Sequence, residues 1–193
     1  FISAEELFKN EKDCINWCTI IDKKSGVYLI KGQIDEAIKG YEKAKDILDS
    51  HSSENGDSAF SIIFDDIYFM HGIRFTNIKI NKVISGRIYR NLGDAYYRKG
   101  NPKKALENLN KSLEIFKDVD DPDQLGQCLC LLGMVNRDSL NFGIALEYFN
   151  ESDKIFENIN DNYLRGWVRI QFGIYYLFLK QWKDAKISLD LAM

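Results

Sequence analysis

A 40-residue internal repeat constrains the fold of this chain more than any other feature of its sequence. When the sequence is aligned on itself at an offset of 40, small residues coincide with small ones and large residues with large ones in three copies. The coinciding small residues are Gly86, Gly126 and Gly166, then Gly93, Gly133 and Gly173, then Ala105, Ala145 and Ala185. Such strict spacing indicates stacked copies of one structural unit, because each copy must present the same contacts to the next.

A fourth copy lies upstream of these three. Its residues Ser25, Tyr28, Gly32, Ala37, Tyr41 and Ala44 reproduce the offsets of Gly93, Tyr96, Gly100, Ala105, Leu109 and Ser112. The spacing from Ser25 to Gly93 exceeds one period, which predicts an inserted segment at about 51–80. The predicted repeats are about 13–50, 81–120, 121–160 and 161–193, in one domain that spans 1–193 and belongs to a larger protein. Since the last copy stops before the position that matches Phe156, we expect the repeats to continue.

Each copy is predicted to form two helices. Between them in the second copy, Gly100, Asn101 and Pro102 supply a helix end, an N-cap and a first helical residue. Asp13, Asn81, Asp121 and Asp161 share one phase and are predicted N-caps of the first helix of each pair. The expected helices are 14–31 and 34–49, 82–99 and 102–118, 122–139 and 142–158, and 162–179 and 182–193. Ser3 and Glu6 form a capping box that predicts a short helix over about 4–11.

The insert is ambiguous in its secondary structure. A polar stretch, HSSENGDS, is followed by a run rich in aromatic and β-branched residues. A helix at about 58–71 is favoured, and a hairpin with Asp65 and Asp66 in its turn is the alternative. Its large apolar residues are expected to pack on the repeats, or else to form a plug or a second binding surface; they are Phe60, Phe64, Ile67 and Phe69.

Composition and motifs argue against several function classes. With 26 basic and 29 acidic residues the formal net charge is −3, which gives no support to nucleic-acid binding. No apolar run is long enough to span a bilayer, and we expect a cytoplasmic protein. The four cysteines are spaced C-x3-C and C-x-C without nearby histidine, which does not fit a metal site. We find no phosphate-binding loop, zinc-protease motif or nucleophile elbow, so we expect no catalytic residue, cofactor or enzyme activity.

The repeats resemble the tetratricopeptide repeat. Leu92, Gly93, Tyr96, Gly100 and Ala105 match that family's pattern of Leu, Gly, Tyr, Gly and Ala. The usual period is about 34 residues, so these copies resemble the longer variety found in Pins-type adaptors, Rap-type regulators and MalT-type signalling ATPases. The resemblance implies an all-α, right-handed solenoid of antiparallel helix pairs. It is specific for the fold and only weakly specific for function, because the motif residues are the packing residues.

In that family the first helix of each pair lines a concave groove that takes a peptide. Carried over to this sequence, the groove would be basic at one end and apolar at the other. Its predicted partner-binding residues are Arg87, Arg90, Asn91, Asp94, Tyr97 and Arg98, then Gln127, Met134 and Arg137, then Trp167, Ile170, Gln171 and Ile174; the first copy would present Thr19, Asp22, Lys23, Gly26 and Leu29. Since guanidinium groups can bind carboxylates in bidentate geometry, we expect a partner with acidic and bulky apolar residues. Alternatively, the arginines are solvated or paired with neighbours such as Asp94 and Glu107.

Two functions remain open from the sequence. The favoured one is a protein- or peptide-binding scaffold in a regulatory protein. The alternative is a ligand- or autoinducer-sensing arm of a signalling ATPase or transcription regulator. A nucleotide-binding loop or a DNA-binding helix–turn–helix elsewhere in the gene would favour the second. Neither the partner nor the oligomeric state follows from the sequence.

Overall fold

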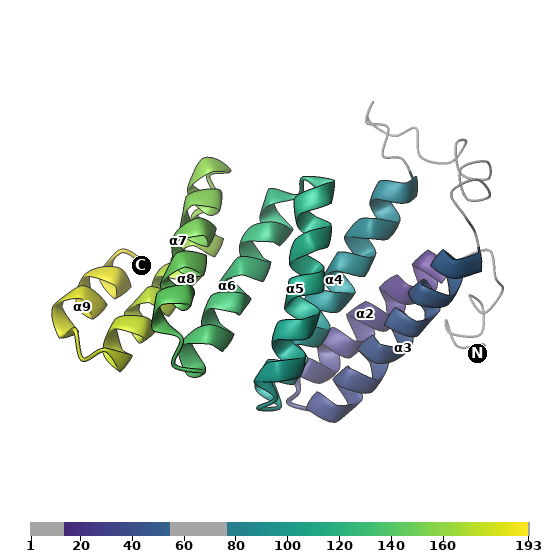
Figure 1. Ribbon diagram of the computed structural model, residues 1–193, viewed down its shortest axis with the longest axis horizontal. Helices are drawn as coiled ribbons and strands as arrows, with labels where there is room; N and C mark the ends of the chain where they lie inside the picture. The colour runs from purple at the N-terminus through teal and green to yellow at the C-terminus, as the bar shows by residue number, and fades with distance from the viewer. Residues whose placement is uncertain (1–13, 55–76, 193) are drawn as a thin grey trace. The chain divides into compact units, whose positions relative to one another are not determined.

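The computed structural model describes residues 14–54 and 77–192, and every regular element within those ranges is an α-helix (Figure 1). The helices are α2 (Cys14–Ile30), α3 (Ile34–Glu54), α4 (Asn77–Arg98), α5 (Pro102–Val119), α6 (Pro122–Asp138), α7 (Phe142–Asn158), α8 (Asn162–Phe178) and α9 (Trp182–Asp190). The all-α class predicted from the repeat is therefore confirmed. The short helix expected at 4–11 and the helix or hairpin expected at 58–71 lie outside the described residues.

The helix boundaries match the repeat closely except around the insert. α3 continues to Glu54 and α4 begins at Asn77, so each helix extends into the range expected for the insert. The predicted N-cap Asn81 is therefore wrong, because it lies inside α4. Ser and His have only modestly lower helix propensity than Ala, and residues 41–55 contain no Gly or Pro, so nothing in the sequence ends α3 at residue 49. α9 is shorter than expected and ends at Asp190.

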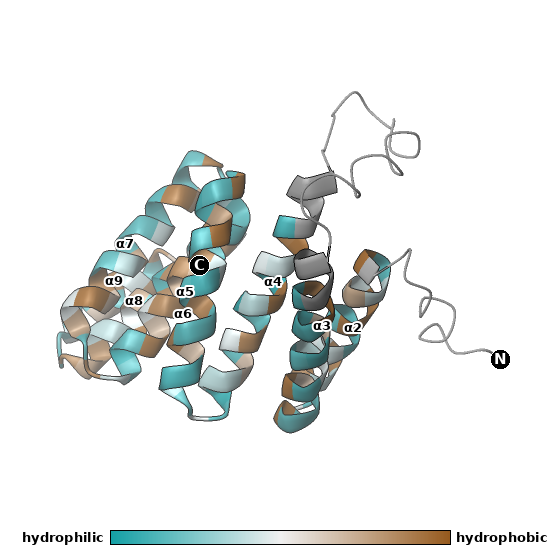
Figure 2. Ribbon diagram, turned by 45° about the vertical axis from the view of Figure 1, so that its right-hand side comes forward, coloured by the Kyte–Doolittle hydropathy of each residue, from teal (hydrophilic) through white to brown (hydrophobic). Residues whose placement is uncertain are grey.

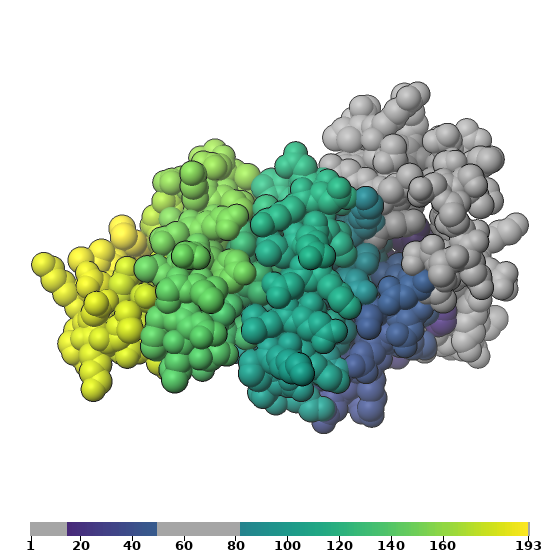
Figure 3. Space-filling view, in the orientation of Figure 1, coloured from purple at the N-terminus to yellow at the C-terminus, as the bar shows by residue number. Residues whose placement is uncertain are grey.

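The described residues fall into two compact units, divided after Gly100. The first unit contains α2, α3 and α4, and the second contains α5 to α9. In the space-filling view, the atoms of the second unit form a continuous surface (Figure 3). Its core includes Phe149, Phe156 and Val168, which are fully buried. In the first unit, Cys18 and Ile88 anchor a smaller apolar cluster.

Three-residue connections join the two helices of each pair, and their geometry repeats. At the end of α6, the N–H of Asn141 donates to the carbonyl of Asn136 at 2.9 Å and the N–H of Leu140 to that of Arg137 at 3.0 Å. This is the Schellman arrangement, which needs a left-handed residue after the helix. Leu140 has φ +64° and Lys180 φ +59°, where the earlier pairs have Gly32 and Gly100. The glycine signal therefore marks only the first two of these turns.

The predicted N-caps at the three described positions other than Asn81 are confirmed by hydrogen bonds. The side chain of Asn101 accepts from the N–H of Lys104 at 3.1 Å. Asp121 and Asp161 accept in the same way from residues three positions later, at 3.1 and 2.9 Å. Each bond satisfies an N–H that the first turn of a helix would otherwise leave without a partner. The starts of α6 and α8 are thus fixed by side chains that recur at the repeat period.

Helical glycines let paired helices approach closely in the second unit. A Cβ atom placed on Gly126 would lie 2.6 Å from the ring of Phe156, and one on Gly133 would lie 2.4 Å from the ring of Phe149. Gly173 has the same relation to Leu189, at 2.7 Å. Since real Cβ atoms do not come this close to other atoms, glycine is required wherever the large side chain of the second helix crosses the first. The repeat spacing of these glycines therefore has a packing cause.

Candidate functional site

The basic residues predicted on α4 belong to an internal polar network of the first unit. Asp22 of α2 is only 5% exposed. Its carboxylate accepts a hydrogen bond from Nη2 of Arg87 at 2.7 Å and another from Nδ2 of Asn91 at 2.7 Å. A buried carboxylate needs such partners, because losing water without replacement is costly. Arg87 and Asn91 therefore link α4 to α2, and both side chains remain partly exposed to solvent.

Two more of the predicted arginines also have partners within α4. Nε of Arg98 donates to Asp94 at 3.0 Å in an i,i+4 ion pair, and this carboxylate raises the pKa of the guanidinium. The guanidinium of Arg90 donates to Oδ1 of Asn91 at 3.2 Å. The pairing of the arginines with neighbours, left open from the sequence, is thus seen for Arg98 with Asp94. A carboxylate from outside would compete with Asp22 and Asp94 for these groups.

In the second unit, two predicted groove residues bind each other rather than face solvent. Arg137 of α6 and Gln171 of α8 are 4% and 6% exposed. Nη1 of Arg137 donates to Oε1 of Gln171 at 2.9 Å, and its Nε donates to Asp138 at 2.8 Å. The guanidinium also lies 5.7 Å from the ring centroid of Phe178, close enough for a cation–π interaction. Arg137 thus connects two successive repeats.

The other predicted residues of α6 and α8 divide by burial. Met134 and Trp167 are partly buried against the core that contains Phe149 and Val168. Ile174 is half-buried, whereas Ile170 is 42% exposed. Apolar residues (brown) recur along the helices of this unit, interleaved with polar ones (Figure 2). Among the predicted apolar residues, Trp167 and Ile170 therefore have large side chains that remain accessible to solvent.

A hollow in the second unit lies beside these two residues. Its volume is about 680 Å³. Its lining comes from α6, from the first half of α8 and from the turn after α9: Gln127, Asn162, Tyr163, Leu164, Gly166, Trp167, Ile170 and Ala192. None of these side chains is charged, although 28% of the residues in the chain are charged. The hollow thus brings together Gln127, Trp167 and Ile170, three residues that the sequence predicted for one surface.

Sequence reasoning missed Tyr163, which is 86% exposed at the edge of the hollow. A signal for it was present. Tyr163, Trp167 and Ile170 are spaced i, i+4 and i+7 and so lie on one face of α8. The contribution of Ala192 could not be read in the same way, because it depends on where α9 ends.

An ion-pair network, also missed from the sequence, fixes the position of α8. Arg165 donates to Asp153 of α7 at 3.2 Å and to Glu157 at 2.6 Å. Arg169 lies 3.6 Å from the same Asp153, and its Nη1 donates to the carbonyl of Leu191 at 2.8 Å. The network thereby ties the turn after α9 to α8 beside the hollow.

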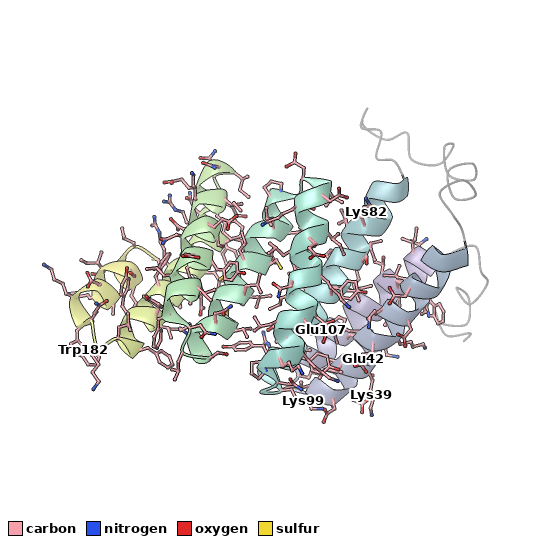
Figure 4. The ribbon with its side chains drawn as sticks, viewed as in Figure 1. Lys39, Glu42, Lys82, Lys99, Glu107 and Trp182 are labelled. Atoms are coloured by element: carbon pink, nitrogen blue, oxygen red, sulfur yellow. The ribbon has the colours of Figure 1, made fainter. Side chains whose placement is uncertain are left out.

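A second hollow lies on α3 in the first unit and has a different character. Its volume is about 460 Å³, and its lining comes from one helix: Lys39, Glu42, Lys43, Asp46 and Ile47. Lys39 and Glu42 project from α3 in Figure 4. Lys39 forms an exposed ion pair with Glu36 at 3.0 Å. The hydroxyl of Tyr96 donates to Glu42, and the ammonium of Lys43 lies 5.1 Å from the ring centroid of Trp17. These charged groups therefore already have partners, and we assign no site there.

The described residues contain no group of three or more His, Cys, Asp or Glu side chains that could hold a metal ion. Cys18, Cys128 and Cys130 are buried. Burial raises the pKa of the Cys130 thiol, which opposes thiolate formation. None of the described helices is long and apolar enough to cross a membrane.

Comparisons with known proteins bear on the fold of these units. Residues 85–158 match the family model described as tetratricopeptide repeat. No curated protein matches the sequence.

Similar solved structures include BtubC (BKLC) from P. vanneervenii, with a TM-score of 0.70 and 17% identity over 95% of this chain and 64% of that one. A second is PH0952 from Pyrococcus horikoshii, with a TM-score of 0.67 and 18% identity over 95% of this chain and 24% of that one. A third is RapI, solved in its apo form, with a TM-score of 0.61 and 21% identity over 93% of this chain and 42% of that one. The chain thus spans less than two thirds of each relative, and at these identities the similarity shows the fold alone, an α-solenoid.

Proposed function

We propose that this chain, whose residues 85–158 match the tetratricopeptide repeat model, binds a segment of a partner protein on the first-helix faces of its repeats. Scaffolds of this kind typically serve protein interaction or sensing without catalysis. The motif residues of the repeat are used for packing. Recognition is therefore left to the side chains that change from copy to copy.

The uncharged hollow of the second unit is the observation that carries this proposal. A volume of about 680 Å³ lies within the range of ordinary ligand sites and has room for a few side chains. Trp167 and Tyr163 offer large aromatic surfaces, and Ile170 adds an exposed aliphatic one. Aromatic residues in such places are favoured anchors of protein interfaces. The partner is expected to present bulky, uncharged side chains here.

The arginines of α4 make a separate contribution to the proposal. An acidic partner residue near Arg90 or Arg98 would enter a network in which Asp22 and Asp94 already bind guanidinium groups. Such a contact exchanges one carboxylate for another, so it adds orientation more than affinity. We therefore propose acidic partner residues as a secondary feature and apolar residues as the primary one. Nucleic acid and membranes are not proposed partners.

A peptide library displayed on phage and selected on the wild-type chain tests the proposal. Peptides that bind at the hollow should bind at least about tenfold more weakly to Ile170→Asp. Ile144→Asp is the matched control, because Ile144 is 48% exposed on α7 and does not line the hollow. Selected peptides that bind both variants as well as wild type would refute recognition at this surface. An Arg90→Glu variant that binds acidic selected peptides as wild type does would remove the secondary feature.

A second candidate function is a sensing arm within a signalling protein. It is supported by the likeness of this fold to PH0952, described as a signal transduction ATPase with a tetratricopeptide repeat sensor. The same hollow would then take a small ligand or a signalling peptide. The complete gene separates the two candidates: a phosphate-binding loop or a DNA-binding helix–turn–helix in it favours the sensing arm. A gene that encodes neither favours the interaction scaffold.

A further inference from the structure

Tyr41 of α3 carries a hydroxyl that has no hydrogen-bond partner among the described residues, although its side chain is only 1% exposed. Tyr41 has the phase of Phe149, whose ring covers Gly133 in the third copy. The phenol therefore extends one oxygen atom further than the ring that packs at the same point of that copy. Because a hydroxyl that leaves water without a new partner is costly, we expect one from outside the described residues.

Gly26 of α2, one of the residues predicted for the groove, leaves an opening at this hydroxyl. A Cβ atom placed on Gly26 would lie 3.6 Å from the oxygen of Tyr41. Beyond its chain neighbours and the backbone of its own helix, it would meet no other described atom within 4 Å. The later copies carry Asp94, Met134 and Ile174 at the same phase. The first copy thus presents an open position where the others present a side chain.

Charged side chains of both signs act on the hydroxyl at this opening. Burial raises the pKa of the Tyr41 hydroxyl, and the carboxylates of Asp22 and Asp94 raise it further. The guanidinium groups of Arg90 and Arg98 each lower the same pKa by less. Asp22 lies on α2, one helical turn before the opening, and is 5% exposed. The two carboxylates are therefore the charges that act most strongly on the hydroxyl.

Neither sign of charge suits a group that enters this opening. A carboxylate from a partner would lie near Asp22 and Asp94, and like charges repel at close range. A cation would enter a cluster in which these two carboxylates already bind Arg87 and Arg98, while Arg90 adds a further positive charge. A neutral group that both donates and accepts hydrogen bonds avoids both costs.

We propose that the opening at Gly26 binds the side-chain carboxamide of an asparagine or glutamine of the partner protein. The inference rests on the proposed function and assigns one contact in the first unit. A carboxamide has two N–H donors, which can bind Asp22 and Asp94, because an ionised carboxylate has about four lone-pair sites. The two hydrogen bonds that Asp22 accepts from α4 use two of its sites. The carbonyl of the carboxamide accepts the hydrogen bond that the Tyr41 hydroxyl otherwise lacks.

Selection of the same phage-displayed peptide library on variants of the chain tests this contact. Peptides selected on wild type should carry asparagine or glutamine at one recurring position, at least about threefold more often than peptides selected on Gly26→Met or Tyr41→Phe. Gly26→Met introduces the residue that the third copy has at this phase, and Tyr41→Phe removes only the hydroxyl. Equal frequencies of these two amino acids in the three selections would overturn the proposal.

Synthetic versions of one selected peptide measure the contact directly by fluorescence polarisation. The recurring asparagine or glutamine is replaced in turn by aspartate, lysine and leucine. Wild type should bind the carboxamide version at least about threefold more tightly than each replacement, and Tyr41→Phe should reduce this preference. Tighter binding of the aspartate or lysine version would assign a charged group to the opening and overturn the proposal. An equal loss for all versions on Tyr41→Phe would assign the hydroxyl to the peptide main chain and also overturn it.

Two matched variants control for general effects of the substitutions. Gly143→Met adds the same side chain to a glycine of α7 with nothing within 4 Å of its Cβ position. Tyr28→Phe removes a phenol two residues after Gly26, on a different face of α2. Both should keep the wild-type preference, and its loss in either would refute the assignment to this opening. If Gly26→Met fails to fold by circular dichroism, Tyr41→Phe decides alone.

The outcome for this contact is separate from that for the hollow of the second unit. Selected peptides that depend on Ile170 but show no preference for a carboxamide leave the proposed function standing and refute only this contact. Peptides that bind Ile170→Asp as they bind wild type, yet keep the carboxamide preference, refute recognition at the hollow and support the contact at Gly26.

Discussion

Replacing Asp22 with alanine should destabilise the first unit by about 2 kcal/mol. The carboxylate accepts two hydrogen bonds at 2.7 Å, from Arg87 and Asn91. Hydrogen bonds to charged groups contribute about 1.5–3 kcal/mol each, so their loss amounts to about 3–6 kcal/mol before any compensation. Arg87 is 34% exposed and Asn91 is half-buried, so both can regain water. This recovery lowers the expected change in the free energy of unfolding to about 2 kcal/mol.

Urea unfolding followed by Trp17 fluorescence measures this change locally. Trp17 packs against the cluster of Cys18 and Ile88 in the first unit, and Trp167 and Trp182 are changed to Phe to leave it as the reporter. A double-mutant cycle with Arg87→Ala should give a coupling of about 1 kcal/mol or more. A change below about 0.5 kcal/mol in Asp22→Ala, the usual range for an uninvolved surface residue, would show that the network contributes nothing to stability.

Three further predictions concern the turns, the phenols and the caps. Leu140→Gly should raise the free energy of unfolding, measured in urea, by about 0.5–1 kcal/mol. The left-handed φ of +64° costs leucine about 1–2 kcal/mol, and the larger conformational entropy that glycine loses on folding offsets part of the gain. A decrease in the free energy of unfolding would contradict this strain. Burial, with a smaller effect of nearby carboxylates, raises the pKa of Tyr41 and brings that of Tyr89 to about 12. The folded state therefore binds more protons than the unfolded state above pH 10, stability should fall as pH rises from about 10 to 12, and Tyr41→Phe should flatten this fall in thermal melts. Asp161→Ala should cost about 1 kcal/mol through its lost cap bond, and Asn141→Ala, which makes no such bond, should cost clearly less in the same urea assay.

The periodic part of the fold could be predicted because it depends on local signals. Asp121 and Asp161 cap their helices in the structure as their phase predicts. Asn81 has the same phase but lies inside α4, because the sequence before it also permits a helix. Leu140 adopts the conformation of Gly100 without being glycine, since the repeat forces the turn at that point. Local rules therefore succeed where the residue itself decides the conformation and fail where the neighbouring helices decide it.

The candidate site was predictable only in part, because helical phase predicts the direction in which a side chain points but not the residue that it contacts. Phase predicted that Trp167 and Ile170 share one face of a helix, and both line one hollow in the structure. It also placed Arg137 toward the same surface, but the approach of α8 buries that guanidinium against Gln171. The bond between Arg87 and Asp22 joins residues 65 positions apart, across the insert, and no periodic pattern relates them. Which arginines remain available to a partner is thus a tertiary property.

The absence of charge in the hollow lining has a consequence for how binding depends on ionic strength. Ion pairs between a partner's carboxylates and the arginines of α4 would be partly exposed. Salt weakens such ion pairs, because the Debye screening length is about 10 Å at 0.1 M ionic strength. Burial of an apolar side chain beside Trp167 is not screened in this way. A titration with sodium chloride should therefore weaken the contribution of α4 and leave that of the hollow almost unchanged. The salt dependence of affinity then measures how much of the recognition each unit supplies.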